Sequence, residues 1–341
     1  GYEIQLLYLG KYLKEIENDK NLITDKNKTP DTIFKKRLSE SGLILKEKIE
    51  SINTEKLYKS FKKYETEING QIIFGEINIK SSDINKNILI IYSFENLKRI
   101  NRYKDEEDDW RYENEKEIKE NIEIKINRKV IDFSYFYNFE KEGKYEIEYI
   151  FRKNLTKTNH LFFGCKSLTY LNFSYFDTQN VTNMFCMFSD CKSLKKINFS
   201  NIKTQNVTNF GSMFSCCSSL SYLDLSDFDT SKANNMSHMF SGCDNITIFN
   251  LSNFDTQNVT DMSFMFSECK TLPYLDLSNF NTKNVIDMSY MFSECRSLLN
   301  VDLSRFSVIR TTNIYGIFLG CKSLLKNNVI TNDNIIKEQF E

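Results

Sequence analysis

The stretch that decides the fold is Met265-Phe-Ser-Glu-Cys-Lys-Thr-Leu-Pro-Tyr-Leu-Asp-Leu-Ser-Asn-Phe-Asn-Thr-Lys-Asn-Val-Ile-Asp-Met-Ser-Tyr290. A near copy follows at once, beginning Met291-Phe-Ser-Glu-Cys295. Cysteines mark the period of this repeat, each 26 residues after the last: Cys165, Cys191, Cys217, Cys243, Cys269, Cys295 and Cys321. A fixed period of this length is typical of stacked repeats, in which each unit buries its apolar side against its neighbours.

The pattern inside each unit predicts a strand, a turn and a short helix. The strand signal is Leu-x-x-Leu-x-Leu-x-x-Phe, as in Leu272 to Phe280, and it matches the strand segment of a leucine-rich repeat. The helix signal is a set of apolar residues at three- and four-residue spacing: Val259, Met262, Met265, Phe266 and Cys269. Asn258, with Asp261 three residues later, is typical of a helix N-cap and its capping-box partner.

The consensus Met-Phe-Ser-x-Cys-x-Ser-Leu-x-x-Leu-Asp-Leu-Ser-x-Phe-Asp-Thr-x-Asn-Val-Thr-x-Met resembles the 26-residue surface-protein repeats of the BspA-like leucine-rich repeat family, in a form typical of protist members. The resemblance covers about residues 155–328. It implies a curved solenoid used for binding, often at a cell surface, with no catalytic residues to carry over. The predicted fold class is therefore α+β: a leucine-rich repeat solenoid of about seven strand–turn–helix coils, preceded by a small β module and an N-terminal helical segment.

Four regions follow from these patterns. Residues 1–68 have helical patterning and many charges, and we expect a helical hairpin or coiled-coil segment there. Residues 69–152 alternate like strands and predict a small β-rich capping module, because the open apolar end of a repeat array needs a cover. Residues 153–327 are the predicted solenoid, and residues 328–341 a C-terminal cap.

Composition limits the classes of function. Hydrophobic residues make up 40% and charged residues 27% of the chain, which is enough apolar material for a packed core. Lys and Arg total 45 against 46 Asp and Glu, so the surface is not generally basic and we expect no nucleic-acid partner. No apolar run is long enough for a transmembrane helix. The oligomeric state is left open.

Little in the chain points to catalysis, so we predict a protein that is not an enzyme and has no cofactor. His160 and His238 have no partner base or metal ligand at a useful spacing. The recurring cysteines lack the paired spacing of a metal site, and we interpret them as small apolar residues that fill the core. Cys186 and Cys216 lie off this column, and we expect them as free thiols on the outer side.

The best functional hint lies between the leucines, where alternation places residues on the concave face of the expected solenoid. One column on this face is Tyr170, Lys196, Tyr222, Ile248, Tyr274 and Asn300. The next is Asn172, Asn198, Asp224, Asn250, Asp276 and Asp302, and a third is serine throughout, from Ser174 to Ser304. Tyrosine is a frequent anchor of protein interfaces, although these columns are also what a solvated repeat consensus would contain.

The sequence thus predicts a non-catalytic interaction module that binds a protein or an extended polymer. One alternative is a cell-surface adhesin or structural coat protein, and another is the recognition region of a larger enzyme. Many free thiols favour a reducing compartment, so we expect a cytoplasmic location, with the cell surface as the alternative.

Overall fold

The computed structural model describes residues 71–95, 113–309 and 312–340. The chain divides into two compact units, residues 1–70 and 71–341, and the description concerns the second. The predicted helical hairpin or coiled coil at 1–68 therefore lies outside the described residues.

The second unit begins with a set of β-strands. These are β1 (Ile72–Ile79), β2 (Asn87–Leu89), β3 (Ile122–Ile126), β4 (Lys129–Ile131), β5 (Phe136–Asn138) and β6 (Gly143–Phe151), with the short helix α6 (Glu115–Lys119) before β3 and a 3-10 turn, η1 (Ser81–Asp83), after β1. Strands β1, β3, β4 and β6 belong to one sheet, and β2 pairs with β5. Isoleucines from β1 and β3 and Tyr149 from β6 are buried, because alternate residues of these strands face the core.

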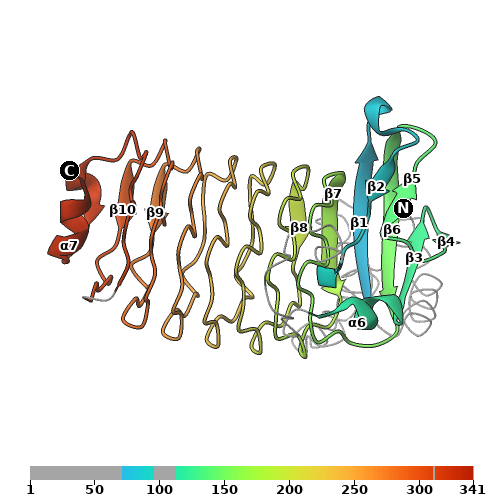
Figure 1. The fold of residues 1–341 in the computed structure, drawn as a ribbon, viewed down its shortest axis with the longest axis horizontal. Helices are drawn as coiled ribbons and strands as arrows, with labels where there is room; N and C mark the ends of the chain where they lie inside the picture. Colours follow the sequence, from blue (N-terminus) through green and yellow to red (C-terminus); the bar gives the residue numbers. More distant parts are fainter. Residues whose placement is uncertain (1–70, 96–112, 310–311, 341) are drawn as a thin grey trace, which may run out of the picture. The chain divides into compact units, whose positions relative to one another are not determined.

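The sheet continues directly into the repeats (Figure 1). Its strand order is β4-β3-β6-β1-β7-β8, where β7 (Leu168–Tyr175) and β8 (Lys196–Asn198) belong to the first two repeat units. Strand β1 is antiparallel to β7, and β7 is parallel to β8. The first repeat strand is thus covered by backbone hydrogen bonds to β1, as an array end requires.

Successive units stack in a constant register. Parallel backbone bridges join equivalent residues 26 positions apart, from Lys157↔Asn183 through to Asp287↔Asn313. Near the end of the array, β9 (Tyr274–Asp276), β10 (Asn300–Asp302) and β11 (Val329–Ile330) form a second parallel sheet. In the third and fourth units the corresponding residues, 222–224 and 248–250, are not assigned as strand.

The predicted leucine-rich repeat solenoid of strand–turn–helix coils, and with it the α+β class, is wrong. The described residues are mostly sheet and turns; their α-helical residues are 94–95 and the short helices α6 and α7 (Asn334–Lys337), none of them inside a repeat unit. No helix begins at Asn258. Its side-chain amide instead donates to the Ser231 carbonyl of the preceding unit (2.7 Å), and Asp261 accepts from Ser263.

Backbone geometry explains why the helical pattern does not form a helix. Phe264 and Glu268 adopt left-handed conformations, with φ of 56° and 60°, and such residues interrupt a right-handed helix. Alternate backbone N–H groups then form hydrogen bonds between units. Those of Met262, Phe264 and Phe266 donate to carbonyls 25 residues ahead, in the next unit. The N–H groups of Met265 and Ser267 close four-residue turns by donating to the carbonyls of Met262 and Phe264, which leaves the apolar side chains at the spacing of a helix.

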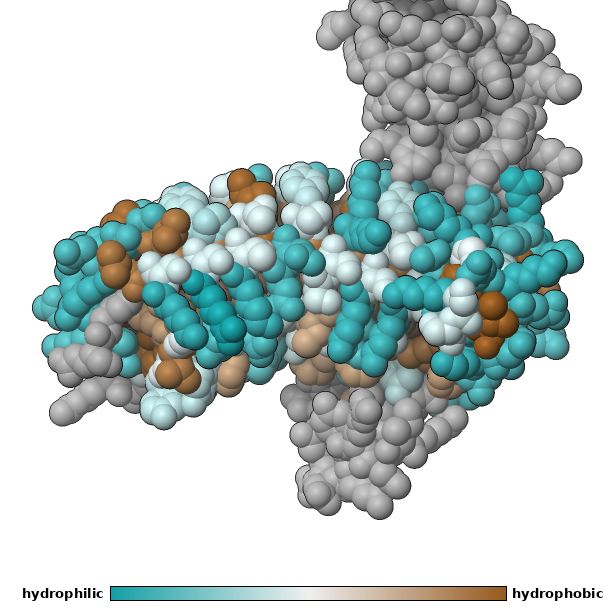
Figure 2. All heavy atoms as spheres, turned by 90° about the horizontal axis from the view of Figure 1, so that it is seen from above, coloured by the Kyte–Doolittle hydropathy of each residue, from teal (hydrophilic) through white to brown (hydrophobic). Residues whose placement is uncertain are grey.

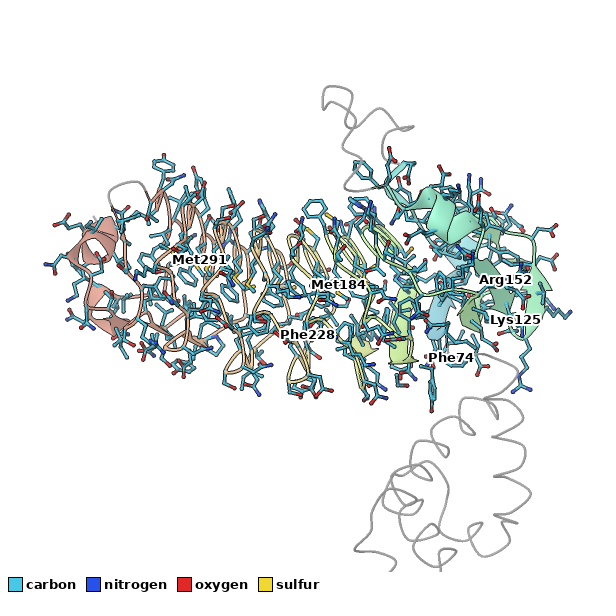
Figure 3. All side chains as sticks on the ribbon, turned by 90° about the horizontal axis from the view of Figure 1, so that it is seen from below. Phe74, Lys125, Arg152, Met184, Phe228 and Met291 are labelled. Atoms are coloured by element: carbon cyan, nitrogen blue, oxygen red, sulfur yellow. The ribbon has the colours of Figure 1, made fainter. Side chains whose placement is uncertain are left out.

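Aromatic rings form the centre of the array. The phenylalanine three residues before each recurring cysteine is buried and stacks on its equivalent in the next unit. The column is Phe162, Phe188, Phe214, Phe240, Phe266, Phe292 and Phe318, with neighbouring centroids 5.5–6.0 Å apart. Methionines such as Met184 and Met291, and Phe228 from the strand side, are also buried within the units (Figure 3).

Threonines form a second internal column at the turn after each strand segment. Thr178, Thr204, Thr230, Thr256 and Thr282 are all buried. Each hydroxyl donates to a carbonyl of the next unit and accepts the N–H of the same residue, as Thr256 does with Asn281. The column ends at Val308, whose backbone N–H donates to Asp333. At this position of the unit, threonine therefore occurs where its hydroxyl can bond to a following repeat unit.

The last unit is followed by a 3-10 turn, η3 (Lys326–Asn328), then β11, α7 and a second 3-10 turn, η4 (Glu338–Phe340). Asp333 caps α7 by accepting from the N–H of Ile335, and Ile336 is completely buried. The region predicted as a C-terminal cap, 328–341, contains β11, α7 and η4. Across the described part of the chain, no helix has the length and apolar content needed to cross a membrane.

Candidate binding face on the repeat strands

The first column of predicted binding residues is exposed along most of its length. We call it the outer column: Tyr170, Lys196, Tyr222, Ile248, Tyr274 and Asn300. The exposed fractions of Tyr222, Ile248 and Tyr274 are 60%, 62% and 50%, although each residue is large and apolar. Tyr170 is less exposed, since its strand lies between β1 and β8. Large apolar side chains held in a row at this exposure are typical of an interaction surface.

The second column is only partly available to a partner, because its side chains build turns. In Asn198, Asp224 and Asn250 the side-chain Oδ1 accepts from both the N–H and the hydroxyl of the serine two residues ahead. Asp276 and Asp302 accept the same backbone N–H, from Ser278 and Ser304. We call Asn172, Asn198, Asp224, Asn250, Asp276 and Asp302 the turn column; its first member, Asn172, is buried.

Charge is distributed unevenly along this face. Lys195 and Lys196 are both exposed in the second unit. In the following four units, the outer and turn columns contain Asp224, Asp276 and Asp302 and no basic residue. Hydrogen bonds from Ser278 hold the pKa of Asp276 below its ordinary value, so this carboxylate is ionised at neutral pH.

Sequence reasoning missed a set of exposed apolar residues in the last units. Leu299, Leu325 and Ile330 are 47%, 65% and 55% exposed, and Leu299 immediately precedes Asn300 of the outer column. Brown, hydrophobic side chains are also concentrated toward the end of the array near α7 on the face that Figure 2 shows. The signal was present in the alignment of units: at the positions equivalent to Leu299 the earlier units have Lys195, Ser221 and Thr247.

The cysteine column has a structural role in the described residues. Each thiol from Cys191 to Cys321 donates to the carbonyl oxygen of a core phenylalanine in the preceding unit, with Sγ–O distances of 2.9–3.3 Å. Burial raises the pKa of these thiols well above the ordinary value, which makes them unreactive. No group of three or more potential ligands in the described ranges is placed to hold a metal ion.

The two other cysteines differ from each other. Cys216 is exposed, as predicted, but Cys186 is buried, and burial raises its pKa to about 12. Cys186 occupies one of the left-handed turn positions, with a φ of 55°, and its thiol is hydrogen-bonded with Ser212 and Ser189. The expectation that Cys186 lies on the outer side is therefore wrong.

A cavity of about 640 Å³ lies beside α6, apart from the repeat strands. Its lining is charged and includes Glu95, Glu115, Glu117, Lys119 and Lys157. These groups are largely engaged: Glu115 pairs with Lys119, and Glu117 accepts from the backbone of Thr156. The arrangement supports the fold of α6.

His160 is buried at the start of the repeats, and its ring lies against Phe94, Phe163 and Phe185. Its Nδ1 has no hydrogen-bond partner among the described residues. Burial lowers its pKa from 6.5 to about 3. The side chain is therefore neutral in the folded protein and serves as part of the core.

We expect this histidine to make the fold sensitive to acid. Its folded-state pKa is depressed, so the unfolded chain takes up a proton that the folded chain cannot, and stability falls as pH drops from 6.5 toward 3. At pH 5 the loss is about 2 kcal/mol. The change His160→Phe, with Phe264 as precedent at the equivalent left-handed position, should remove this part of the pH dependence in denaturant titrations.

His238→Phe is the matched control. His238 stacks on Phe264 and is only partly buried, so its pKa is lowered less and its removal should change the pH dependence less. If the free energy of unfolding has the same slope against pH for wild type and His160→Phe between pH 6.5 and 4.5, His160 is protonated in the folded protein without an energetic cost.

The repeat region matches a known family. Residues 131–248 and 234–338, which together span more than half of the chain, match DUF285, described as a Mycoplasma protein of unknown function. The chain belongs to this family. The resemblance to BspA-like leucine-rich repeats is thus wrong as an assignment, together with the solenoid it implied: this DUF285 chain has turns where those repeats would place helices. No curated protein and no solved structure matches it.

Proposed function

We propose that this DUF285 chain is a non-catalytic interaction protein and that it binds another protein through the outer column of its repeat strands. The observation that carries the proposal is the exposure of Tyr222, Ile248 and Tyr274, three large apolar side chains at equivalent positions of consecutive units. Packing in the interior accounts for repeated residues such as the cysteines, and hydrogen bonds within turns account for the turn column, but no packing requirement accounts for these three.

The repeat itself shows that apolar residues are not required at these positions. Lys196 and Asn300 occupy the same column in other units and are exposed there. Polar substitution of the outer column should therefore leave stability nearly unchanged, within about 0.5 kcal/mol for each site. Exposed apolar surface that the fold does not need is most simply explained by a partner that covers it.

The test is co-purification of tagged full-length protein from its native cells, with quantitative mass spectrometry. The variant Tyr222→Asn/Ile248→Asn/Tyr274→Asn follows the precedent of Asn300. We expect a specific partner to be recovered with wild type and lost, at least tenfold, with this variant, since anchors at an interface each contribute more than 1 kcal/mol.

A control variant makes the same chemical change away from this face. Val130, Ile286 and Leu319 are 61%, 60% and 58% exposed and lie outside the outer column. Val130→Asn/Ile286→Asn/Leu319→Asn should retain the partner. If both variants retain every partner, the outer column is not the binding surface, and if both lose the same partners, general surface hydrophobicity explains the recovery.

A further inference from the structure

We propose that the outer face from the third to the sixth unit binds an extended polypeptide segment in which apolar side chains alternate with lysine or arginine. This inference rests on the proposed function and names the chemistry of the partner. It follows from the arrangement of three carboxylates beside the exposed apolar residues.

The apolar and acidic groups occupy neighbouring columns. Tyr222 and Tyr274 are each two residues before an aspartate, Asp224 and Asp276, so both side chains of each pair leave the same side of the strand segment. Ile248 occupies the outer column in the unit between them. A ligand that covers the apolar row must therefore pass within reach of the carboxylates.

Each carboxylate has one oxygen available. Oδ1 of Asp224, Asp276 and Asp302 accepts from the serine two residues ahead, and Oδ2 makes no hydrogen bond to any described residue. The turn thus fixes the orientation of each side chain. It leaves a negatively charged acceptor for a donor that comes from outside the protein.

The spacing suits an extended chain. Neighbouring parallel strands lie about 4.8 Å apart, which places Asp276 and Asp302 roughly 5 Å from each other and Asp224 roughly 10 Å from Asp276. An extended polypeptide advances about 3.3 Å per residue and directs successive side chains to opposite sides, so a segment that lies between the two columns can direct one set to the outer column and the other to the carboxylates. Long, flexible lysine or arginine side chains on such a segment can reach all three carboxylates while the apolar side chains contact the tyrosines and Ile248.

The negative charge of this face also disfavours nucleic acids and anionic membranes as partners. Phosphate groups of a nucleic acid or of an anionic membrane would be repelled by Asp224, Asp276 and Asp302, and no basic residue in these two columns offsets them between Lys196 and Lys326. A cationic segment is the complement of the face.

The experiment measures binding of short labelled peptides to the full chain by fluorescence anisotropy. One peptide alternates leucine with lysine, a second alternates leucine with glutamate, and a third alternates serine with lysine. We expect the leucine–lysine peptide to bind, more weakly at higher salt, and the other two to bind at least tenfold more weakly.

The repeat supplies a variant that removes charge and preserves the turn. Asn198 and Asn250 make the same bonds to serine in the turn column, so Asp224→Asn/Asp276→Asn/Asp302→Asn should fold normally. It should bind the leucine–lysine peptide roughly tenfold more weakly, because each exposed charge pair contributes modestly and three are removed. Its binding should also depend less on salt.

The matched control removes three carboxylates at another edge of the units. Asp177, Asp229 and Asp255 accept from the N–H two residues ahead, and Asn281 does the same in a later unit. Asp177→Asn/Asp229→Asn/Asp255→Asn should leave peptide affinity unchanged within twofold. Equal losses in both variants, or equal binding of the leucine–glutamate peptide, would overturn the proposal.

The outcome also separates this inference from the proposed function. If the native partner is lost with the outer-column variant but retained by Asp224→Asn/Asp276→Asn/Asp302→Asn, the face binds a protein that is not recognised by positive charge. If neither variant affects the partner, both proposals are wrong.

Discussion

Replacing Phe240 by alanine is expected to lower the free energy of unfolding by about 4 kcal/mol, the typical cost of removing a fully buried aromatic ring. Phe240 is completely buried in the fourth unit and stacks between Phe214 and Phe266, with ring centroids 5.8 Å and 5.6 Å away. Because each unit is held mainly by its two neighbours, a cavity there weakens the contacts on both sides. Denaturation by urea, followed by far-UV circular dichroism, measures the loss.

The control for this change is Tyr222→Ala, in a neighbouring unit. Tyr222 also has an aromatic ring, but 60% of it is exposed, and its removal should cost less than 0.5 kcal/mol. Similar costs for Phe240→Ala and Tyr222→Ala would mean that the phenylalanine column does not form the core of the array.

The second large effect is expected for Thr256→Val, which keeps the shape of the side chain and removes its hydroxyl. The hydroxyl donates to the Asn281 carbonyl (3.0 Å) and accepts the Asn281 N–H (2.8 Å), and Thr256 is buried. Valine leaves both backbone groups of Asn281 without this partner, so we expect the free energy of unfolding to fall by about 3 kcal/mol. The same denaturant titration provides the measurement.

Thr260→Val is the control: it makes the same chemical change at a threonine that lies outside the buried column. Thr260 is exposed, and the Asn234 carbonyl that accepts its hydroxyl also accepts its backbone N–H. Its replacement should cost less than 0.5 kcal/mol. A Thr256→Val protein as stable as Thr260→Val would show that the buried hydroxyls do not join the units.

The sequence predicted the period of the fold and the inward-facing residues. The spacing of the cysteines indicated stacked units, and these side chains lie in the core, where they donate to phenylalanine carbonyls. The helix prediction failed because left-handed residues produce the same apolar spacing: Tyr290, His238 and Phe264 have φ near 55°, and nothing in their identity signals this conformation. The hints were glycines at equivalent positions: Gly316, with a φ of 64°, and Gly164, Gly242 and Gly320 at the positions equivalent to Glu268.

The repeat pattern does not show which phenylalanines form the central stack. Phe254 and Phe280, at the end of the strand segment, stack on each other. The column through every unit is instead formed by the phenylalanine of Met-Phe-Ser. A single unit does not reveal which phenylalanine faces its equivalent, because this depends on the path of the turns.

The candidate face was predicted in position but not in detail. Alternation correctly placed Tyr222 and Tyr274 at the surface. It did not show that aspartates such as Asp224 use one oxygen to hold a turn, or that Asn172 is buried, since both depend on local backbone geometry and on contact with β1.

Site-specific photo-cross-linking in the native cells tests the central claim most directly. A photoreactive residue at Ile248, in the middle of the outer column, should give a discrete protein adduct. The same residue at Gln257, exposed at another edge of the same unit, should give none. Adducts of the same protein from both positions, or an adduct from Gln257 alone, would contradict a binding surface on the outer column.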